Sequence, residues 1–188
     1  MPKVIIFAGA NGTGKSTLAN SALEKNTIYI NADAIKVKDN KSSIEAGKKA
    51  LLLTGSCIDK EKDFSFETTM SGLTLLNNFK LLKKAEYHIV IFYLFVYPVE
   101  LLVERIKERV KKGGHDVELK DIVRRYYRSA HHFWNIYKNY SSEWAIINNN
   151  ESRYRNIAVG DKEKFEVIDD REFSIFQEVT KNAKKQKK

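Results

Sequence analysis

A nine-residue segment near the N-terminus constrains this chain more than any other feature. Residues 9–17 read GANGTGKST and match G-x-x-x-x-G-K-[ST], the pattern of a phosphate-binding P-loop. The apolar run from Val4 to Ala8 predicts a buried strand leading into the loop, and Thr17 to Lys25 predict a helix after it. A strand, a glycine-rich loop and a helix in this order favour a P-loop over an ordinary glycine-rich turn. We therefore expect the chain to bind ATP or GTP.

The residue types within this loop suggest separate roles. Glycines let the backbone curl so that its N–H groups point at phosphate oxygens, and the following helix N-terminus adds partial positive charge. We expect Lys15, on an exposed loop, to reach the β- and γ-phosphates, and the Ser16 hydroxyl to ligate Mg²⁺. The predicted nucleotide-binding residues of the loop are Gly9, Ala10, Asn11, Gly12, Thr13, Gly14, Lys15, Ser16 and Thr17.

Short apolar runs alternate with longer helical patterns along the chain of 188 residues, which predicts a single α/β domain over residues 1–180 with a parallel sheet. The expected strands are Lys3–Ala8, Thr27–Ile30, Phe64–Phe66, His88–Val96 and Glu143–Asn148, with two short strands within Tyr154–Asp169. The expected helices are Thr17–Lys25, Ser43–Lys62, Gly72–Ala85, one opened by Pro98 at position N1, Leu119–Tyr140 and Arg171–Lys181.

The net charge of +9 is concentrated at the C-terminus, since residues 181–188 contain five lysines and no acids. We expect this tail to be disordered and solvated, which we favour over a tail that attracts nucleic acid or an acidic partner. The single cysteine, Cys57, cannot form an internal disulfide, and the sequence leaves no room for a signal peptide before the first strand. No apolar run is long enough to cross a membrane, so we expect a cytoplasmic protein.

Two segments that follow predicted strands carry acids where a parallel sheet places its functional groups. Asp33 follows strand Thr27–Ile30, and we expect it to accept the proton of a substrate hydroxyl; the alternative is a helix N-cap. Glu67 follows strand Phe64–Phe66 and precedes two threonines, so this segment can hold a substrate or water around Mg²⁺; the alternative is a turn and helix cap. The expected substrate-binding residues are Asn31, Glu67, Thr68 and Thr69.

A basic segment from Arg105 to Arg128 is the third candidate region. Two predicted helices are joined here by a loop, Lys111 to His115, which contains two glycines. Such a helical lid could place guanidinium groups on the γ-phosphate, although a solvated basic face is the alternative for each arginine taken singly. We expect Arg109 and Arg125 to act on the transferring phosphoryl group, Arg124 to contact the nucleotide and Arg105 to contribute less.

These motifs together resemble the zeta-toxin-like family of bacterial P-loop kinases. The resemblance covers Val4 to about Ser129 and rests on GANGTGKST, NAD, FETTMS, RIKERVKKGGHDV and DIVRRYYRS in this order. It implies a five-stranded parallel sheet with the P-loop strand in the middle, ATP and Mg²⁺ as cofactors, Lys15 as the P-loop lysine, Asp33 as the base and Glu67 as a substrate contact. It further implies UDP-N-acetylglucosamine as the acceptor and a separate antitoxin protein as a partner.

Two departures from that family bear on the substrate more than on kinase activity. Glu118 stands where the family often has proline, and the chain lacks the long C-terminal extension of larger toxins. A nucleotide or polynucleotide kinase, favoured by the positive charge, therefore remains an alternative. A non-catalytic nucleic-acid-binding module regulated by a nucleotide is a further alternative, but such a module has no need of a base beside its phosphate site.

Overall fold

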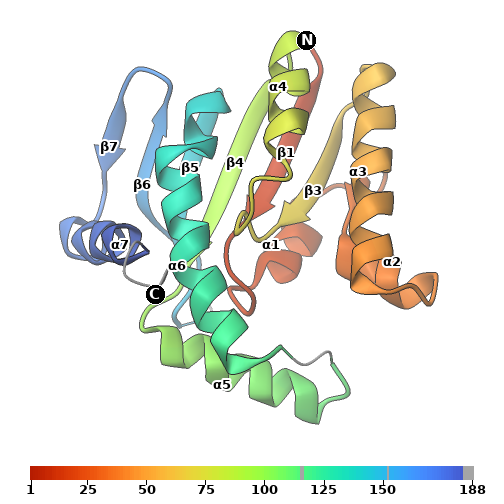
Figure 1. The fold of residues 1–188 in the computed structure, drawn as a ribbon. Coiled ribbons are helices and arrows are strands. Elements are labelled where there is room, and N and C mark those ends of the chain that lie inside the picture. The colour runs from red at the N-terminus through yellow and green to blue at the C-terminus, as the bar shows by residue number, and fades with distance from the viewer. Residues whose placement is uncertain (115–116, 152, 184–188) are drawn as a thin grey trace.

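A computed structural model describes residues 1–114, 117–151 and 153–183 of the chain. Seven strands form one sheet in the order β2-β3-β1-β4-β5-β6-β7 (Figure 1). The strands are β1 (Lys3–Ala8), β2 (Ile28–Ile30), β3 (Phe64–Thr68), β4 (His88–Phe95), β5 (Glu143–Asn148), β6 (Arg155–Asp161) and β7 (Phe165–Val167). The first five in sequence pair in parallel, and β6 and β7 extend the sheet in antiparallel pairing.

Seven α-helices and one 3₁₀ helix surround this sheet within the described ranges. They are α1 (Lys15–Ala22), α2 (Ala32–Lys38), α3 (Ser43–Asp59), α4 (Leu76–Lys84), α5 (Val99–Lys111), α6 (Leu119–Asn135), η1 (Tyr137–Tyr140) and α7 (Asp170–Asn182). α4 and α6 cover the near face of the sheet, and α5 lies across its lower end, beyond the carboxyl ends of the strands (Figure 1). α3 packs on α2 and α4, and α7 packs on α6.

The central strands are apolar on both faces because helices cover both sides of them, as is usual for parallel strands. Val4, Ile6, Ile89 and Ile91 are fully buried. In the register of the sheet, Ala8 at the end of β1 lies beside Thr68 of β3 and Tyr93 of β4. The P-loop therefore begins at the middle of the carboxyl edge of the sheet, between the ends of two neighbouring strands.

The predicted fold class is confirmed: the chain is an α/β protein with five parallel strands and the P-loop strand in the middle of them. The two short strands expected within Tyr154–Asp169 are present as β6 and β7. They bring the total to seven, where the family resemblance implies five, because the two-stranded antiparallel extension lies outside the parallel set.

Several predicted helix boundaries are wrong, each for a local reason. α2 was not predicted; the Asn31 side chain caps it by accepting hydrogen bonds from two backbone N–H groups. Pro98 is the N-cap of α5 and not its first helical residue. The predicted helix to Tyr140 ends at Asn135, whose side chain donates to the His131 carbonyl oxygen at 2.9 Å and competes with the helical bond there. The predicted tail boundary at Lys181 lies inside α7.

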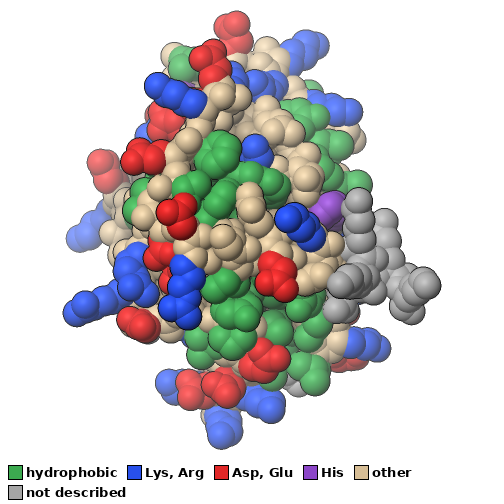
Figure 2. Space-filling model, turned by 90° about the vertical axis from the view of Figure 1, so that its left-hand side faces the viewer, with side chains coloured by type: hydrophobic (Ala, Val, Ile, Leu, Met, Phe, Trp, Pro, Cys, Tyr) green, Lys and Arg blue, Asp and Glu red, His purple; other side chains and the backbone are tan. Residues whose placement is uncertain are grey.

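The edge formed by β7 carries exposed apolar side chains, Phe165 and Ile168 among them. Figure 2 shows this side of the molecule, where hydrophobic side chains gather near the centre and basic and acidic side chains are interspersed around them. The described residues on this face therefore present a mixture of charges and not a continuous basic surface of the kind that binds nucleic-acid backbones.

Candidate active site

The P-loop adopts a backbone conformation that its glycines make possible. Gly9, Gly12 and Gly14 all have positive φ angles, of 138°, 84° and 92°. A Cβ atom at Gly9 would lie 2.4 Å from the Leu94 carbonyl oxygen, so the loop passes too close to β4 for a side chain. The loop thus forms a concave backbone surface of the shape that receives phosphate groups.

Lys15 is the first residue of α1 and is half-buried, so the expected position on an exposed loop is wrong. Its Nζ donates to the Ala10 carbonyl oxygen at 2.8 Å and so lies inside the loop. Burial lowers the pKa of Lys15, and the nearby carboxylates of Glu67 and Asp33 partly oppose that shift. The ammonium group is held where an anion would compensate for its lost hydration.

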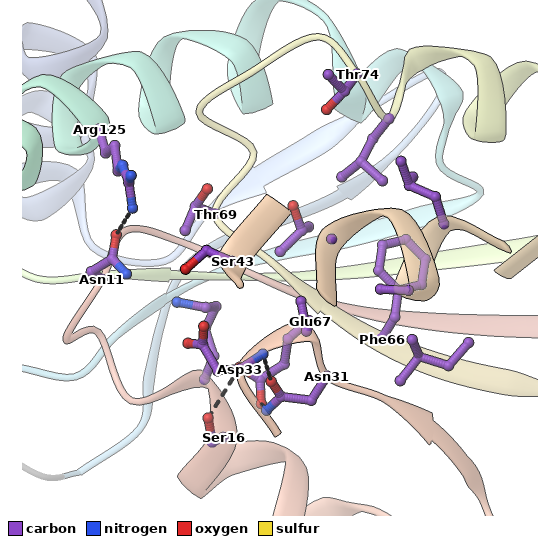
Figure 3. A pocket seen from close by; sticks show the side chains of 18 of the residues that line it. Asn11, Ser16, Asn31, Asp33, Ser43, Phe66, Glu67, Thr69, Thr74 and Arg125 are labelled. Atoms are coloured by element: carbon purple, nitrogen blue, oxygen red, sulfur yellow. Dashed lines mark hydrogen bonds between the residues drawn. The ribbon is translucent and has the colours of Figure 1, made fainter. Parts of the chain in front are cut away.

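Glu67 is the centre of a hydrogen-bonded cluster beside the loop (Figure 3). Its carboxylate accepts from Ser16 Oγ at 3.1 Å, from Asn31 Nδ2 at 3.0 Å and from the Tyr29 hydroxyl. Burial raises the pKa of Glu67, while Lys15 and the hydrogen bond from Ser16 act in the opposite direction. Ser16, Asn31 and Glu67, which the sequence places far apart, are therefore brought together, with Tyr29 as a partner that the sequence analysis did not include.

Asp33 lies in the first turn of α2 and is exposed toward the same cavity. Its carboxylate accepts no hydrogen bond from any described residue, in contrast to the carboxylate of Glu67. The neighbouring Asn31 provides the helix cap through Oδ1, which bonds the backbone N–H groups of Asp33 and Ala34 at 2.8 and 3.2 Å. The alternative role of N-cap thus belongs to Asn31, and the Asp33 carboxylate has no hydrogen-bond donor among the residues that the structure describes.

A cavity of about 750 Å³ connects these groups. Its walls come from the P-loop and the start of α1, from α2, from one face of α3, from the end of β3, and from three arginines of the lid helices. The predicted site residues that line it are Asn11, Gly12, Gly14, Lys15, Ser16, Thr17, Asn31, Asp33, Glu67, Thr68, Thr69, Arg109 and Arg125. Gly9, Ala10, Thr13 and Arg124 are not among its lining residues.

The lid arginines differ in what holds them. Arg125 donates to Asn11 Oδ1 and lies near Asp121 Oδ2, each at 3.4 Å, and so reaches the P-loop through long contacts (Figure 3). Arg109 lines the cavity, and its charge is close enough to lower the pKa of Lys15. Arg105 instead donates from Nη2 to the carbonyl oxygens of Asn149 and Asn150, both at 2.7 Å. Arg105 therefore fastens α5 to the end of β5.

The loop between α5 and α6 bears on the predicted hinge. Gly113 has a φ of +83°, which suits glycine. A Cβ atom at Gly114 would lie 2.6 Å from Arg109 Cγ, so Gly114 packs against the arginine that faces the cavity. His115, the last residue of the predicted basic loop, and the following Asp116 lie outside the described residues. Hinge motion of this loop stays a prediction.

Asn149 is a site residue that the sequence analysis missed. Its Nδ2 donates to the Thr13 carbonyl oxygen at 2.9 Å and ties the end of β5 to the P-loop. A Cβ atom at Gly14 would lie only 2.4 Å from that same nitrogen. The signal in the sequence was the run of three asparagines, residues 148–150, directly after a predicted strand.

Gly14→Ala is expected to lower the free energy of unfolding by at least ~2 kcal/mol, because the left-handed conformation costs ~1–2 kcal/mol for other residues and the methyl group meets Asn149. Urea denaturation measures this. Gly55→Ala is the matched control: Gly55 lies inside α3 with no atom within 4 Å of an added Cβ, so this change should stabilise by roughly 0.5–1 kcal/mol. Equal unfolding curves for the two variants would contradict the packing described.

The oxygen donors at the cavity fit a hard cation such as Mg²⁺. The hydroxyl of Ser16 and the carboxylates of Glu67 and Asp33 are ligand types that Mg²⁺ prefers, and Mg²⁺ usually takes only one or two protein ligands beside phosphate and water. The described residues contain no group of three or more His, Cys, Asp or Glu side chains that could hold a metal ion by themselves. A metal bound jointly with nucleotide phosphates is the arrangement that suits this site.

A comparison with known protein sequences finds an uncharacterised protein of Haemophilus influenzae that is 35% identical over 127 residues. The match covers 65% of this chain and 90% of that protein. The chain belongs to the family of this Haemophilus influenzae protein. No protein-family profile matches the chain. This relative has no assigned activity, so membership of the family does not by itself indicate a function.

Solved structures show the fold that this family adopts. One chain of the AvrRxo1-ORF1:AvrRxo1-ORF2 complex, also crystallised with ATP, has a TM-score of 0.73 at 14% identity, with 96% of this chain and 64% of that chain covered. This chain thus spans less than two thirds of that relative. A chain of the PezAT toxin–antitoxin system of Streptococcus pneumoniae has a TM-score of 0.62 at 16% identity, with 99% and 86% covered. The recognition of a zeta-toxin-like P-loop kinase fold is confirmed.

Proposed function

We propose that the protein is an ATP-dependent kinase that transfers the γ-phosphoryl group to a hydroxyl of a small molecule. The observation that carries this proposal is the free carboxylate of Asp33 in the same cavity as Lys15 of the P-loop. A protein that only binds a nucleotide needs the lysine but has no use for an unpaired carboxylate beside it. The solved relative with ATP supports the choice of nucleotide.

The two carboxylates of the cavity suit different roles. Glu67 already accepts three hydrogen bonds, which occupy three of its roughly four lone-pair sites and fix its position. Asp33 accepts none from the described residues and is exposed to the cavity, so it can approach an acceptor hydroxyl and take its proton. Asp33 is therefore the candidate base, and Glu67 a group that orients Ser16 and contacts the substrate or the metal.

The remaining charges of the site match the needs of phosphoryl transfer. The P-loop N–H groups and Lys15 would hold the β- and γ-phosphates, and Ser16 with Glu67 would hold Mg²⁺, which supplies charge neutralisation on the phosphate oxygens when it is bound. Arg109 and Arg125 line the cavity from the lid helices, and Figure 3 shows Arg125 on the other side of Asn11 from Asp33. The P-loop and the guanidinium groups can thus hold the phosphoryl group while Asp33 faces the acceptor.

For the acceptor we propose UDP-N-acetylglucosamine, and for the biological role the toxin of a toxin–antitoxin pair. Both proposals follow from the family resemblance, and the PezAT relative, which comes from a toxin–antitoxin system, supports the second. The test is incubation of the protein with ATP, Mg²⁺ and UDP-N-acetylglucosamine, followed by mass spectrometry for the addition of one phosphate group. Transfer only to the 5′ end of an oligonucleotide would instead support a polynucleotide kinase.

Among the described residues, none of the helices has the length and apolar character needed to cross a lipid bilayer. This observation agrees with an enzyme that meets its substrates in solution, and we propose the cytoplasm as its compartment.

Arg109→Ala and Arg125→Ala are each expected to lower kcat by ~10²-fold or more while changing ATP affinity much less. The reason is that a preorganised cation acts mainly on charge that develops in the transition state. Arg109→Lys and Arg125→Lys should rescue only part of the loss, because lysine lacks the planar fork that matches phosphate oxygens. Single-turnover transfer and calorimetry measure the two quantities separately.

Arg105→Ala is the matched control for this pair. It should lower the melting temperature, because Arg105 binds two backbone carbonyl oxygens, and should change kcat of the folded enzyme less than the other two replacements. A kcat loss at Arg105 as large as that at Arg109, with Arg125→Ala silent, would contradict the assignment of the lid arginines.

A further inference from the structure

A second cavity of about 480 Å³ adjoins the one that holds the P-loop lysine. The two cavities share wall residues, among them Ser43, Thr69 and Arg125, so they lie directly beside each other. In Figure 3, Ser43 and Thr69 lie between Asp33 and Thr74, which marks the direction from the candidate base toward this second cavity. A substrate with its hydroxyl at Asp33 could therefore extend into it.

The lining of the second cavity is cationic and rich in hydroxyl groups. Three arginines on two adjacent turns of α6 contribute to it, and its described lining contains no carboxylate. The other polar side chains are hydroxyls from the end of β3, from the segment between β3 and α4, and from α3. The polar lining residues are Ser43, Thr68, Thr69, Ser71, Thr74, Arg124, Arg125 and Arg128. Guanidinium and hydroxyl donors without an acid are the chemistry of an anion site.

Arg128 is the residue of this set whose charge lacks a partner. Arg124 and Arg125 both lie near the carboxylate of Asp121, at 2.8 and 3.4 Å. Arg128 is half-buried and makes no hydrogen bond or ion pair with any residue in the described part of the chain. Since a partly desolvated guanidinium group is costly to leave unpaired, its position indicates an anionic ligand.

Hydrogen bonds fix the hydroxyl residues of the second cavity in place. Thr68 Oγ1 accepts from the Met70 backbone N–H at 3.0 Å, and the hydroxyls of Thr69 and Ser71 lie 2.9 Å apart. The His132 ring, also on α6, lies with Nδ1 3.1 Å from the Met70 carbonyl oxygen. The contact between His132 and Met70 therefore fixes the distance between α6, which carries the arginines, and the segment that carries the hydroxyl groups. A preformed ligand site requires such a fixed distance.

From these observations we propose that the second cavity binds a phosphate group of the acceptor, with Arg128 as its main anchor. This inference rests on the proposed kinase function in one respect: that function identifies the ligand as the acceptor, whose hydroxyl would lie at Asp33. The space of about 480 Å³, bounded by α3, the segment before α4 and α6, suits the phosphate of a small molecule. Arg124, expected from the sequence to contact the nucleotide, would instead contact the acceptor.

The test is calorimetric titration of the protein, first saturated with Mg²⁺ and a non-hydrolysable ATP analogue, with inorganic phosphate and with uridine diphosphate. Filling the P-loop removes its own anion site from the measurement. At least one of the two probes should bind, and Arg128→Ala should weaken that binding roughly ten- to a hundredfold, as expected for the loss of charge-assisted hydrogen bonds. Arg128→Lys should recover part of it. Arg171→Ala, which removes an exposed arginine of α7, should leave it unchanged.

Three outcomes would overturn the inference: equal affinities in Arg128→Ala and the unchanged protein, no binding of either probe to the loaded protein, or Arg128-dependent binding of a 5′-phosphorylated oligonucleotide alone. The melting temperature of each variant confirms that it is folded. The same titration in Lys15→Ala separates this inference from the proposed function, because that variant should lose phosphoryl transfer and retain Arg128-dependent binding. In Lys15→Ala, loss of phosphoryl transfer together with retained Arg128-dependent binding of the probe supports the site. Retained phosphoryl transfer together with loss of that binding contradicts it.

Discussion

Lys15→Ala is expected to abolish phosphoryl transfer, with a fall in turnover of at least ~10²- to 10³-fold, while the protein remains folded. The Lys15 ammonium group lies inside the P-loop, 2.8 Å from the Ala10 carbonyl oxygen, where it would meet the β- and γ-phosphates. Its removal deletes a fixed positive charge from the place where phosphoryl charge develops. Single-turnover transfer of labelled phosphate from ATP measures the loss, and circular dichroism confirms the fold.

The same variant makes a prediction about pH. Burial lowers the pKa of Lys15 below its ordinary value of 10.5, so between the lowered value and 10.5 the unfolded chain binds more protons than the folded one. The contribution of Lys15 to the free energy of unfolding therefore rises with pH across that window. The alanine variant should lack this rise when the two proteins are compared by urea denaturation. A folded variant with unchanged turnover would refute the role of Lys15 in the P-loop.

Asp33→Asn is expected to reduce turnover by ~10²- to 10⁴-fold and to leave ATP affinity nearly unchanged. The amide has the shape of the carboxylate but cannot accept the proton of the acceptor hydroxyl. Because Asp33 accepts no hydrogen bond from the described residues, the replacement should also leave the melting temperature unchanged. Calorimetry for ATP and single-turnover transfer provide the two measurements.

Glu67→Gln is the matched comparison for Asp33→Asn, since it makes the same chemical change at the carboxylate that is already bonded by Ser16, Asn31 and Tyr29. Its main effect should be to raise the concentration of Mg²⁺ or of acceptor that phosphoryl transfer requires. If Asp33→Asn instead weakened ATP binding and transfer to the same extent, Asp33 would be a metal or structural residue and not the base.

The sequence was sufficient to predict the parallel part of the fold because its strands are short apolar runs with clear boundaries. It also placed Asp33 and Glu67 near the carboxyl edge, where the ends of parallel strands meet. The predicted end of the strand at Phe66 is wrong, because Glu67 lies inside β3, which continues to Thr68. The sequence was less successful at helix ends. Asn31 as the cap of α2 and Asn135 at the end of α6 act through side-chain to backbone hydrogen bonds, which hydrophobic periodicity does not reveal.

The contacts between distant segments could not be predicted from a single sequence. The arginines of the lid were recognised as a set, and Arg105 was expected to contribute less than Arg109. Both line the cavity, but the pattern did not reveal that Arg105 binds two backbone carbonyl oxygens. Both lie on one helix, one turn apart. Their difference arises from the asparagine-rich segment after β5, which lies about 40 residues further along the chain. The contact that holds Arg105 is thus revealed only by the tertiary structure.

The asparagine segment 148–150 has a practical consequence for where the chain can be lengthened. Asn148 bonds Glu172 of α7, Asn149 bonds Thr13, and Asn150 bonds the backbone of Tyr97. An inserted residue there would displace several elements together. The turn at residues 162–164 between β6 and β7 is fully on the surface and is far better suited to a peptide tag or a fluorescent label.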